Sequence, residues 1–552
     1  MRQLLLLAGL LPALAFADDA ELRHLDPHEQ ILEYLRQSDA AVPQRPPLHP
    51  SLVTYNREAI IPPQCYTRTE GRNNPCYVCH QDKRAAGENA MNDGDLQREY
   101  SFSEVGMRNH WVNLFEDRRE RVAAIGDAEI LEWIDGDNYP ELAPRLRAAG
   151  FQGWIPDLDG LESGAAAFDG QGFARDGSGW VAFNYKPLPS TFWPTNGSTD
   201  DVMIRLPAEF RRTAAGAASR DVYRANLAIL EAGIKDLDSV SVPAINEHVV
   251  GADLDGDGRL GQARRVARQT QFVGNAASWF KDDGLYPLGT EFLHTVRYVG
   301  VGEDGAIGPS RRMKEVRYMR KQYLLPRHAL YNAYLEEGYE TDAGYLPGYI
   351  DLGPHGLDNE MGWVLHGFIE DRQGRLRANT YEENLFCMGC HTSIGATIDK
   401  VFSFARKIDG AAGWGYLDLR GMPDAPNRGE TAGEIATYLE RAGGGGEFRS
   451  NPEMQARWFG PDGRVDRERL AAARDVYDLI TPSRERALTL NKAYRVIVED
   501  QDFIFGRDAT VMPPENVYET IDNDTAPTLP DRFTYRWDLR LAWPDTPEAG
   551  AP

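Results

Sequence analysis

Two pentapeptides with the same pattern constrain this chain more than any other feature of its sequence. Residues 76–80 (CYVCH) and 387–391 (CMGCH) both follow Cys-x-x-Cys-His, and together they use four of the five cysteines. Paired Cys-x-x-Cys zinc knuckles usually lie about 15–20 residues apart. Here the first cysteines, at positions 76 and 387, are 311 positions apart. Zinc and local disulfides are therefore the less favoured explanations, although both stay open at this point.

The same pattern is the one to which haem is attached covalently, because the two thiols add to the haem vinyl groups and the histidine ligates the iron. The two pentapeptides resemble the haem-attachment sites of multi-haem c-type cytochromes, and the resemblance covers ten residues of the chain. It implies two covalently bound haem c groups. The residues that it assigns to attachment and to proximal iron ligation are Cys76, Cys79, His80, Cys387, Cys390 and His391.

The resemblance leaves the sixth ligand of each iron to be found. A second histidine, a methionine or an empty position would each give different chemistry. For the first haem the candidate is His110, in a segment, 103–115, that we expect to be helical. For the second haem it is Met512, in a Met-Pro segment similar to those that supply the distal sulfur in many small c-type cytochromes. Both residues have an ordinary core or surface position as the alternative. Rival ligands are Met91 and Met107 for the first haem, and Met422, His355 and His366 for the second.

Cys65 is the fifth cysteine and has no obvious partner once the other four hold haem. It is a candidate thiolate ligand, a redox-active thiol near the first haem, or an intermolecular bridge. An inert buried thiol is the alternative.

Residues 253–260 (DLDGDGRL) match the beginning of a calcium-binding loop. Asp253, Asp255 and Asp257 occupy positions 1, 3 and 5, a glycine occupies position 6, and the backbone oxygen of Arg259 falls at position 7. Position 12 is Arg264 where a glutamate is expected, and no clear helix precedes the loop. The sequence therefore predicts a Ca²⁺ site whose bidentate ligand comes from elsewhere, with a plain acidic turn as the alternative.

The N-terminal segment has the features of a secretory signal peptide. A basic Arg2 is followed by an apolar run from residue 4 to 16 and by an Ala-Phe-Ala site that ends at Ala17. The run is too short to span a bilayer, and no later stretch approaches about 18 apolar residues. We therefore expect a cleavable signal, a periplasmic protein and no transmembrane segment in the mature chain. No cysteine follows the expected cleavage site, which argues against a lipid anchor.

The formal charge is −24, so the surface should repel nucleic acid and anionic membranes. Such a surface suits docking to a partner, a redox protein that donates or accepts electrons and has a basic docking face. Solubility without a specific partner is the alternative.

Alternation of apolar and polar residues predicts strands over 292–298, 314–318 and 363–369. Helices are expected over 26–36, 221–232, 431–442, 467–479 and 482–499. The predicted fold is α+β and multidomain, with mainly helical haem-c regions at both ends flanking a mixed antiparallel-sheet middle domain. The predicted boundaries are 1–17 for the signal peptide, 18–134 for the first haem region, 135–350 for the middle domain with the calcium loop, and 351–552 for the second haem region.

The resemblance implies a di-haem c-type cytochrome that carries out one-electron transfer. One alternative is a di-haem oxidoreductase, similar to peroxidases or oxygenases, with one open catalytic haem. The other alternative is a polymer- or protein-binding module whose haems serve as an electron outlet.

Overall fold

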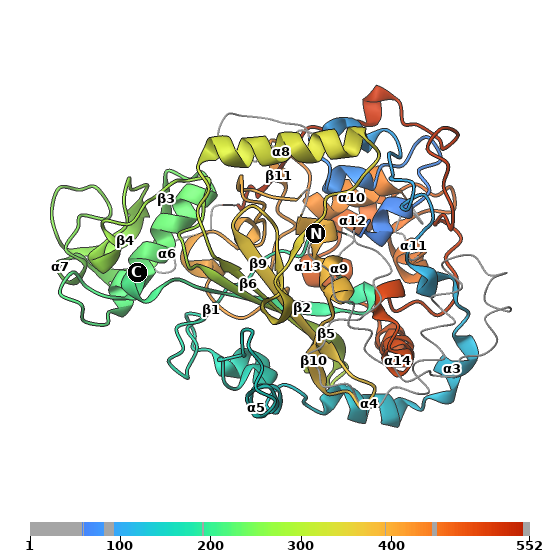
Figure 1. Cartoon of the computed structure of the whole chain (residues 1–552), viewed down its shortest axis with the longest axis horizontal. Helices are drawn as coiled ribbons and strands as arrows, with labels where there is room; N and C mark the ends of the chain where they lie inside the picture. The colour runs from blue at the N-terminus through green and yellow to red at the C-terminus, as the bar shows by residue number, and fades with distance from the viewer. Residues whose placement is uncertain are drawn as a thin grey trace, which may run out of the picture. The chain divides into compact units, whose positions relative to one another are not determined.

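The structure is a computed structural model that describes residues 58, 60–81, 93–189, 193–391, 394–443 and 450–544. Its main element is an antiparallel sheet with the strand order β1-β2-β5-β6-β9-β8-β7, in which β10 also pairs with β9 (Figure 1). The strands are β1 (Val181–Ala182), β2 (Thr199–Arg205), β5 (Glu291–Val301), β6 (Ile307–Lys321), β7 (Ile350–Asp351), β8 (Leu357–Asp358), β9 (Trp363–Glu370) and β10 (Leu376–Ala378).

Both faces of the central strands are covered, since all eight residues of β9 are buried. Phe292, Met319 and Leu365 lie side by side on β5, β6 and β9 and belong to the largest apolar cluster. Leu293, Tyr318 and Phe368 belong to a second cluster with helix α5 (Leu142–Ala148). A sheet buried on two sides needs apolar residues at consecutive positions, which weakens the alternation that marks a half-exposed strand.

Two smaller pairs of strands complete the described sheets. Strand β3 (Ser239–Asn246) pairs with β4 (Gln262–Ala267), and β11 (Asn427–Arg428) pairs with β12 (Asp538–Leu541). Figure 1 shows β3 and β4 beside helices α6 and α7. The helices are α3 (Arg119–Ala124), α4 (Asp127–Asp135), α6 (Arg220–Ile234), α7 (Glu247–Val250), α8 (Arg327–Asp342), α9 (Tyr381–His391), α10 (Glu434–Ala442), α11 (Pro452–Trp458), α12 (Arg467–Ala471), α13 (Val476–Ile480) and α14 (Arg484–Asp500).

The predicted architecture with mainly helical ends is wrong. The described N-terminal part, before α3, contains only short 3-10 turns, among them η1 (Pro63–Tyr66), η2 (Cys76–Val78) and η4 (Val112–Phe115). On the C-terminal side, strands β7 to β10 join the large sheet, because β9 pairs with β6. The sheet thus continues past residue 350 and includes chain that was expected to form a helical region.

Several local predictions are confirmed and two are wrong. The three predicted strands lie within β5, β6 and β9, and helices α6, α10 and α14 form where helices were expected. The helix expected over 103–115 does not form, because the Ser103 and Asn109 side chains accept the backbone N–H groups of Gly106 and Trp111. The helix expected over 467–479 is two helices, since Asp475 caps the start of α13. The helix expected over 26–36 lies outside the described residues.

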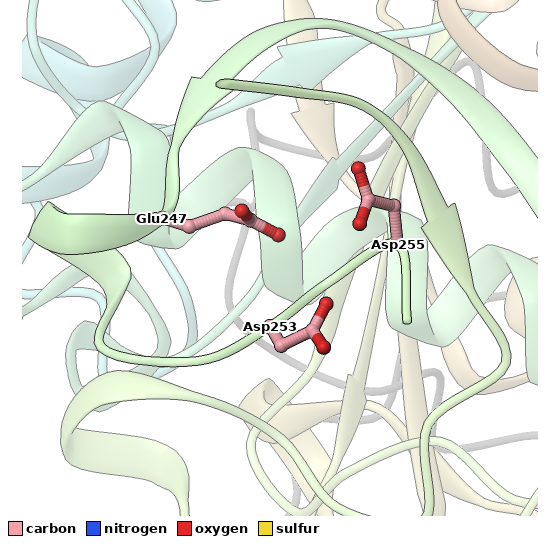
Figure 2. Close-up of side chains that lie close together, drawn as sticks. All are labelled: Glu247, Asp253 and Asp255. Carbon is pink, nitrogen blue, oxygen red and sulfur yellow. The ribbon is translucent and has the colours of Figure 1, made fainter. Parts of the chain in front are cut away.

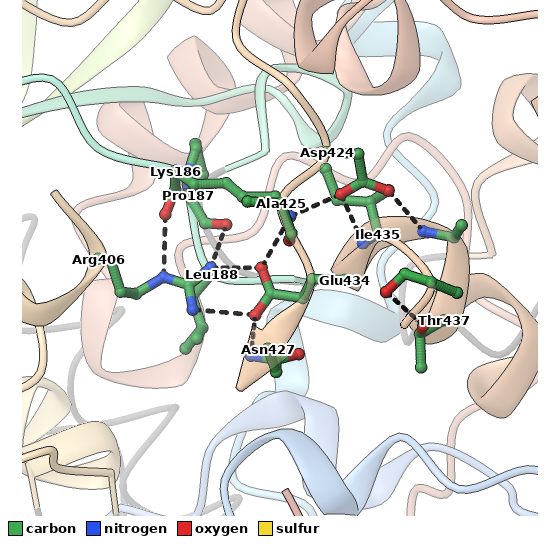
Figure 3. Close-up of polar contacts among 12 residues, drawn as sticks. Lys186, Pro187, Leu188, Arg406, Asp424, Ala425, Asn427, Glu434, Ile435 and Thr437 are labelled. Atoms are coloured by element: carbon green, nitrogen blue, oxygen red, sulfur yellow. Dashed lines mark hydrogen bonds and ion pairs between the residues drawn. The ribbon is translucent and has the colours of Figure 1, made fainter. Parts of the chain in front are cut away.

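A buried network of charges joins segments that are distant in the sequence (Figure 3). Glu434, the first residue of α10, accepts hydrogen bonds from both Nη atoms of Arg406, at 2.9 and 2.6 Å, and from Asn427 Nδ2 at 3.0 Å. The ammonium group of Lys186 lies 3.3 Å from Glu434 and 2.6 Å from Asp424. Glu434, Arg406 and Lys186 are at most 2% exposed. Each buried charge therefore has a charged partner, as burial requires.

Asp424 in this network also caps α10. Its carboxylate oxygens accept the N–H groups of Ile435 and Ala436, at 3.0 and 3.1 Å. These are two of the N–H groups that a helix leaves without partners at its N-terminus. A Cβ atom on Gly433 would lie 2.1 Å from Asp424 Oδ2. Glycine is therefore required where the carboxylate approaches the helix.

We predict that Glu434→Gln lowers the free energy of unfolding by about 3 kcal/mol, because it leaves Arg406 and Lys186 buried without their full counter-charge. Glu440→Gln on the same helix is the matched control, because Glu440 pairs with Arg467 at the surface. The control should cost less than about 1 kcal/mol. Urea unfolding of both variants measures the difference, and equal midpoints would show that the buried network does not stabilise the fold.

Candidate functional site

Helix α9 places the second pentapeptide at the end of a capped helix. Thr380 Oγ1 accepts the N–H of Glu383 at 3.2 Å, and the Glu383 carboxylate accepts the N–H of Thr380 at 2.8 Å. This reciprocal pair is a capping box. Cys387, Cys390 and His391 follow at relative positions i, i+3 and i+4, so they lie on one side of the helix.

That side of α9 faces a cavity, here called the sheet-face cavity, which has about 970 Å³ of empty space, part of it open solvent. Its floor is formed by β2, β5, β6 and β9, and α9 and the segment around residue 403 form its walls. The lining residues are Tyr185, Leu188, Asp200, Val202, Phe292, His294, Arg317, Tyr318, Met319, Leu365, His366, Phe386, Cys387, Cys390, His391, Phe402, Ser403 and Arg406. The lining is mainly apolar with a few polar groups, which is the usual composition of a small-molecule site.

Four buried polar atoms in this lining have no hydrogen-bond partner: Asp200 Oδ1, His391 Nδ1 and both ring nitrogens of His366. Asp200 Oδ2 accepts the Tyr185 hydroxyl and lies 3.2 Å from His294 Nε2, but Asp200 Oδ1 has no partner. His391 Nδ1 is also without a hydrogen bond. Burial lowers the pKa of His391 to about 4, so its ring is neutral at physiological pH. A bound molecule could therefore meet both a carboxylate oxygen and a neutral imidazole.

The first pentapeptide forms the 3-10 turn η2 and is fixed by side chains from outside it. Asn74 Oδ1 accepts the N–H of Tyr77 at 3.2 Å, and Gln97 Nε2 donates to the carbonyl oxygen of His80 at 2.7 Å. His80 Nδ1 lies 2.9 Å from Asp93 Oδ2. A carboxylate on Nδ1 orients an imidazole and leaves Nε2 available to a ligand.

The two pentapeptides lie near each other, although 311 positions separate them. A Cβ atom on Gly389 would lie 2.6 Å from the carbonyl oxygen of Ile60, so α9 packs directly on the segment that leads to Cys65. Burial raises the pKa of Cys79, and the nearby thiols of Cys390 and Cys65 raise it further. Burial likewise raises the pKa of Cys76 to about 12 and that of Cys390 to about 11. All five thiols are free, and these three are held in the neutral form.

This arrangement bears on the predicted cofactors. The orientation of His80 and the unpartnered Nδ1 of His391 fit residues that hold a bound group. Among the described residues, the cysteines and histidines do not form a group with the spacing of a metal site.

His110 packs against Trp111 and Phe505, and Met512 is 53% exposed. Neither of these two candidate distal ligands lines the sheet-face cavity. Met91 lies outside the described residues.

The predicted calcium loop brings two of its aspartates together with a residue that the sequence pattern did not identify. Glu247, at the start of α7, lies with Asp253 and Asp255 so that one oxygen of each is within 4.8 Å of the others (Figure 2). Glu247 is only 1% exposed, and its two oxygens accept the N–H groups of Leu254 and Gly261. Glu247 is therefore the candidate for the carboxylate that the sequence pattern lacks at position 12. Asp257 accepts the N–H of Arg259 and lies outside this group.

Comparison with known proteins assigns the chain to a family. A family model described as "-like lipoprotein" matches residues 50–477. An uncharacterized lipoprotein of Aquifex aeolicus (strain VF5) is 32% identical over 517 residues, which cover 82% of this chain and 86% of that protein. No solved structure matches the chain. Among the described residues, no helix combines the length and the apolar character needed to cross a bilayer.

These matches correct the identification made from the pentapeptides. The matching family is a lipoprotein family and not a cytochrome c family, so the assignment to the di-haem c-type cytochromes is wrong. One-electron transfer by a di-haem cytochrome, the di-haem oxidoreductase and the binding module with a haem electron outlet are withdrawn with it. A lipoprotein family indicates an exported protein. The expectation that no lipid anchor is present rests on residues outside the described part of the chain.

The family match does not test the cofactor predictions, so haem attachment at the two pentapeptides stays a prediction. A haem attached at Cys387 and Cys390 would compete with any other ligand of the sheet-face cavity, because these residues line it. If both sites are loaded, the denatured protein should have the mass of the polypeptide plus two haem groups, because thioether bonds survive denaturation. Cys79→Ala and Cys390→Ala should each reduce or abolish attachment at one site, whereas Cys65→Ala should leave the mass of the attached groups unchanged. A wild-type mass equal to that of the bare polypeptide would eliminate covalent haem.

Calcium binding at Glu247, Asp253 and Asp255 is also a prediction. A ligand that binds only the folded protein stabilises it by about 2.7 kcal/mol at a hundredfold excess over its Kd. Chelation should therefore lower the Tm, and both Glu247→Gln and Asp255→Ala should reduce that response. Asp304→Ala is the matched control, because Asp304 accepts a backbone N–H in another exposed turn. The same Tm with and without chelator, together with no calcium in elemental analysis, would identify the loop as an acidic turn.

Proposed function

The chain belongs to this lipoprotein family, and on that premise we propose that it is a periplasmic protein that binds an apolar small molecule in the sheet-face cavity. The observation that carries the proposal concerns Asp200, a residue of the cavity lining whose buried carboxylate oxygen Oδ1 has no hydrogen-bond partner. An unsatisfied buried polar group costs about 1–3 kcal/mol. Native structures rarely leave such a group without water, an ion or a ligand.

The surroundings of Asp200 support a ligand that is mostly apolar. Val202, Phe292 and Leu365 cover the floor of the cavity, and Phe402 contributes an aromatic ring to its wall. A ligand that buries apolar surface here gains about 25 cal/mol for each Å² removed from water. The carboxylate of Asp200 would then orient the ligand by accepting one hydrogen bond. This combination of a large apolar surface and one fixed polar contact supports selective binding.

The Tyr185–Asp200–His294 group supports a fixed position for that polar contact. The Tyr185 hydroxyl and His294 Nε2 both engage Asp200 Oδ2. They leave Oδ1 as the remaining acceptor and restrict rotation of the carboxylate. Asp200 is 4% exposed, so water does not compete strongly for this oxygen.

Binding of the neutral fluorescent probe N-phenyl-1-naphthylamine tests the proposal. Val202→Phe should fill the floor of the cavity and weaken binding of the probe about tenfold or more, equivalent to about 1.4 kcal/mol. Val249→Phe is the control, because Val249 is 42% exposed and lies outside the cavity. Circular dichroism and Tm should confirm that both variants fold. Equal probe affinity in the wild type and in folded Val202→Phe would overturn the proposal.

A further inference from the structure

A second cavity adjoins the sheet-face cavity, and its charges carry the inference. This side cavity has about 700 Å³ of empty space, part of it open solvent, and it shares Arg317, Phe386 and Cys390 with the sheet-face cavity. The charged residues of its lining are Lys314, Arg317, Arg507, Glu315 and Asp508, and Tyr494 also lines it. Three cationic and two acidic side chains therefore line it, which leaves an excess of one positive charge.

A bulge in β6 brings one of these charged side chains, that of Lys314, into the lining of the side cavity. Val296 pairs with Glu315 and the next residue of β5, Arg297, pairs with Met313, so Lys314 is an extra residue in the strand. Such a bulge breaks the alternation of faces. Lys314 and Glu315 are consecutive, yet both line the side cavity. The Lys314 ammonium group lies 3.9 Å from the centre of the Tyr494 ring.

Glu315 is already shared by two guanidinium groups. Arg317 Nε and Arg507 Nη1 each donate to Glu315 Oε2 at 2.9 Å. Burial alone would raise the pKa of Glu315, but the two arginines outweigh it and hold the pKa at about 2. Glu315 is therefore ionised at physiological pH, and one carboxylate faces two arginines. It cannot neutralise both of them.

Two donors in the side cavity have no acceptor. Arg507 donates through Nη2 to the carbonyl oxygen of Glu383 at 2.6 Å, but its Nε is buried without a partner. The Tyr494 hydroxyl is also buried without a partner. Arg507 is 7% exposed and Tyr494 is 2% exposed. An anionic oxygen atom would satisfy these donors and neutralise the excess charge.

We propose that the side cavity binds the carboxylate group of an amphipathic ligand whose apolar body lies in the sheet-face cavity. The ligand class is thus a monocarboxylic acid whose alkyl or aromatic body also carries a hydrogen-bond donor for Asp200 Oδ1. The shared residues Arg317, Phe386 and Cys390 form the boundary across which such a molecule extends. This inference rests on the proposed function, because it assigns the polar end of the molecule that the sheet-face cavity receives.

Displacement of N-phenyl-1-naphthylamine by decanoate and by decanol tests the inference. The two competitors have the same chain length and differ in charge. The wild type should bind decanoate about tenfold more tightly than decanol, because charge-assisted hydrogen bonds are stronger than neutral ones. Arg507→Gln should remove this preference. Acetate is a third competitor and should not displace the probe, because it lacks an apolar body.

Tyr494→Phe gives a second variant with little risk to folding, because it removes a hydroxyl group that has no partner. It should weaken decanoate binding about fivefold while decanol binding and the Tm stay unchanged. Tyr438→Phe is the control, because Tyr438 is a buried tyrosine of another apolar cluster. It should change neither affinity.

The outcomes separate this inference from the proposed function. Equal affinity for decanoate and decanol in the wild type would overturn the carboxylate site and leave the apolar cavity intact. A preference for decanoate that survives in both Arg507→Gln and Tyr494→Phe would also overturn it. Probe binding that does not respond to Val202→Phe would overturn the proposed function and the inference together.

Discussion

The fold depends on one buried carboxylate, that of Glu434. It connects α10 with the segments around Arg406 and Lys186, which are distant from each other in the sequence. It binds Arg406 through two hydrogen bonds and lies 3.3 Å from the ammonium group of Lys186. Removing three such charges from water is costly, and good geometry is needed to offset the cost. The arrangement fixes the segment around residue 403, which supplies Phe402, Ser403 and Arg406 to the sheet-face cavity. The shape of that cavity therefore follows from an ion pair outside the sheet.

Sequence patterns predicted the regular elements where one physical effect dominates. The strands within β5, β6 and β9 and the helices α6 and α14 follow from apolar periodicity. The helix predicted over 103–115 does not form, because the Ser103 and Asn109 side chains accept backbone N–H groups and these bonds replace those of a helix. The prediction of mainly helical ends failed because a few expected helices were extended to whole regions. No α-helix forms over 103–115, and β7 to β10 belong to the large sheet.

The candidate site was predictable only in part. The carboxylates of Asp253 and Asp255 follow from their spacing, but Glu247 precedes the loop and no spacing rule includes it. Alternation along β6 would place Lys314 and Glu315 on opposite faces, whereas a bulge brings both to one cavity. The proximity of Cys79 and Cys390 is a property of the tertiary structure alone. Asp200 carries the proposed function, yet no local motif marks it.

The contacts of the first pentapeptide also set an order of events during synthesis. Asn74 donates to the carbonyl oxygen of Phe533 at 2.5 Å, and Trp537 donates to that of Tyr77 at 2.7 Å. Partners this far apart in the sequence make folding slow, because a long loop must close first. The thiols of residues 76–80 are made early but cannot be enclosed until residues 533–537 have folded against them. Until then this segment is open to enzymes that modify thiols, and its burial closes that interval.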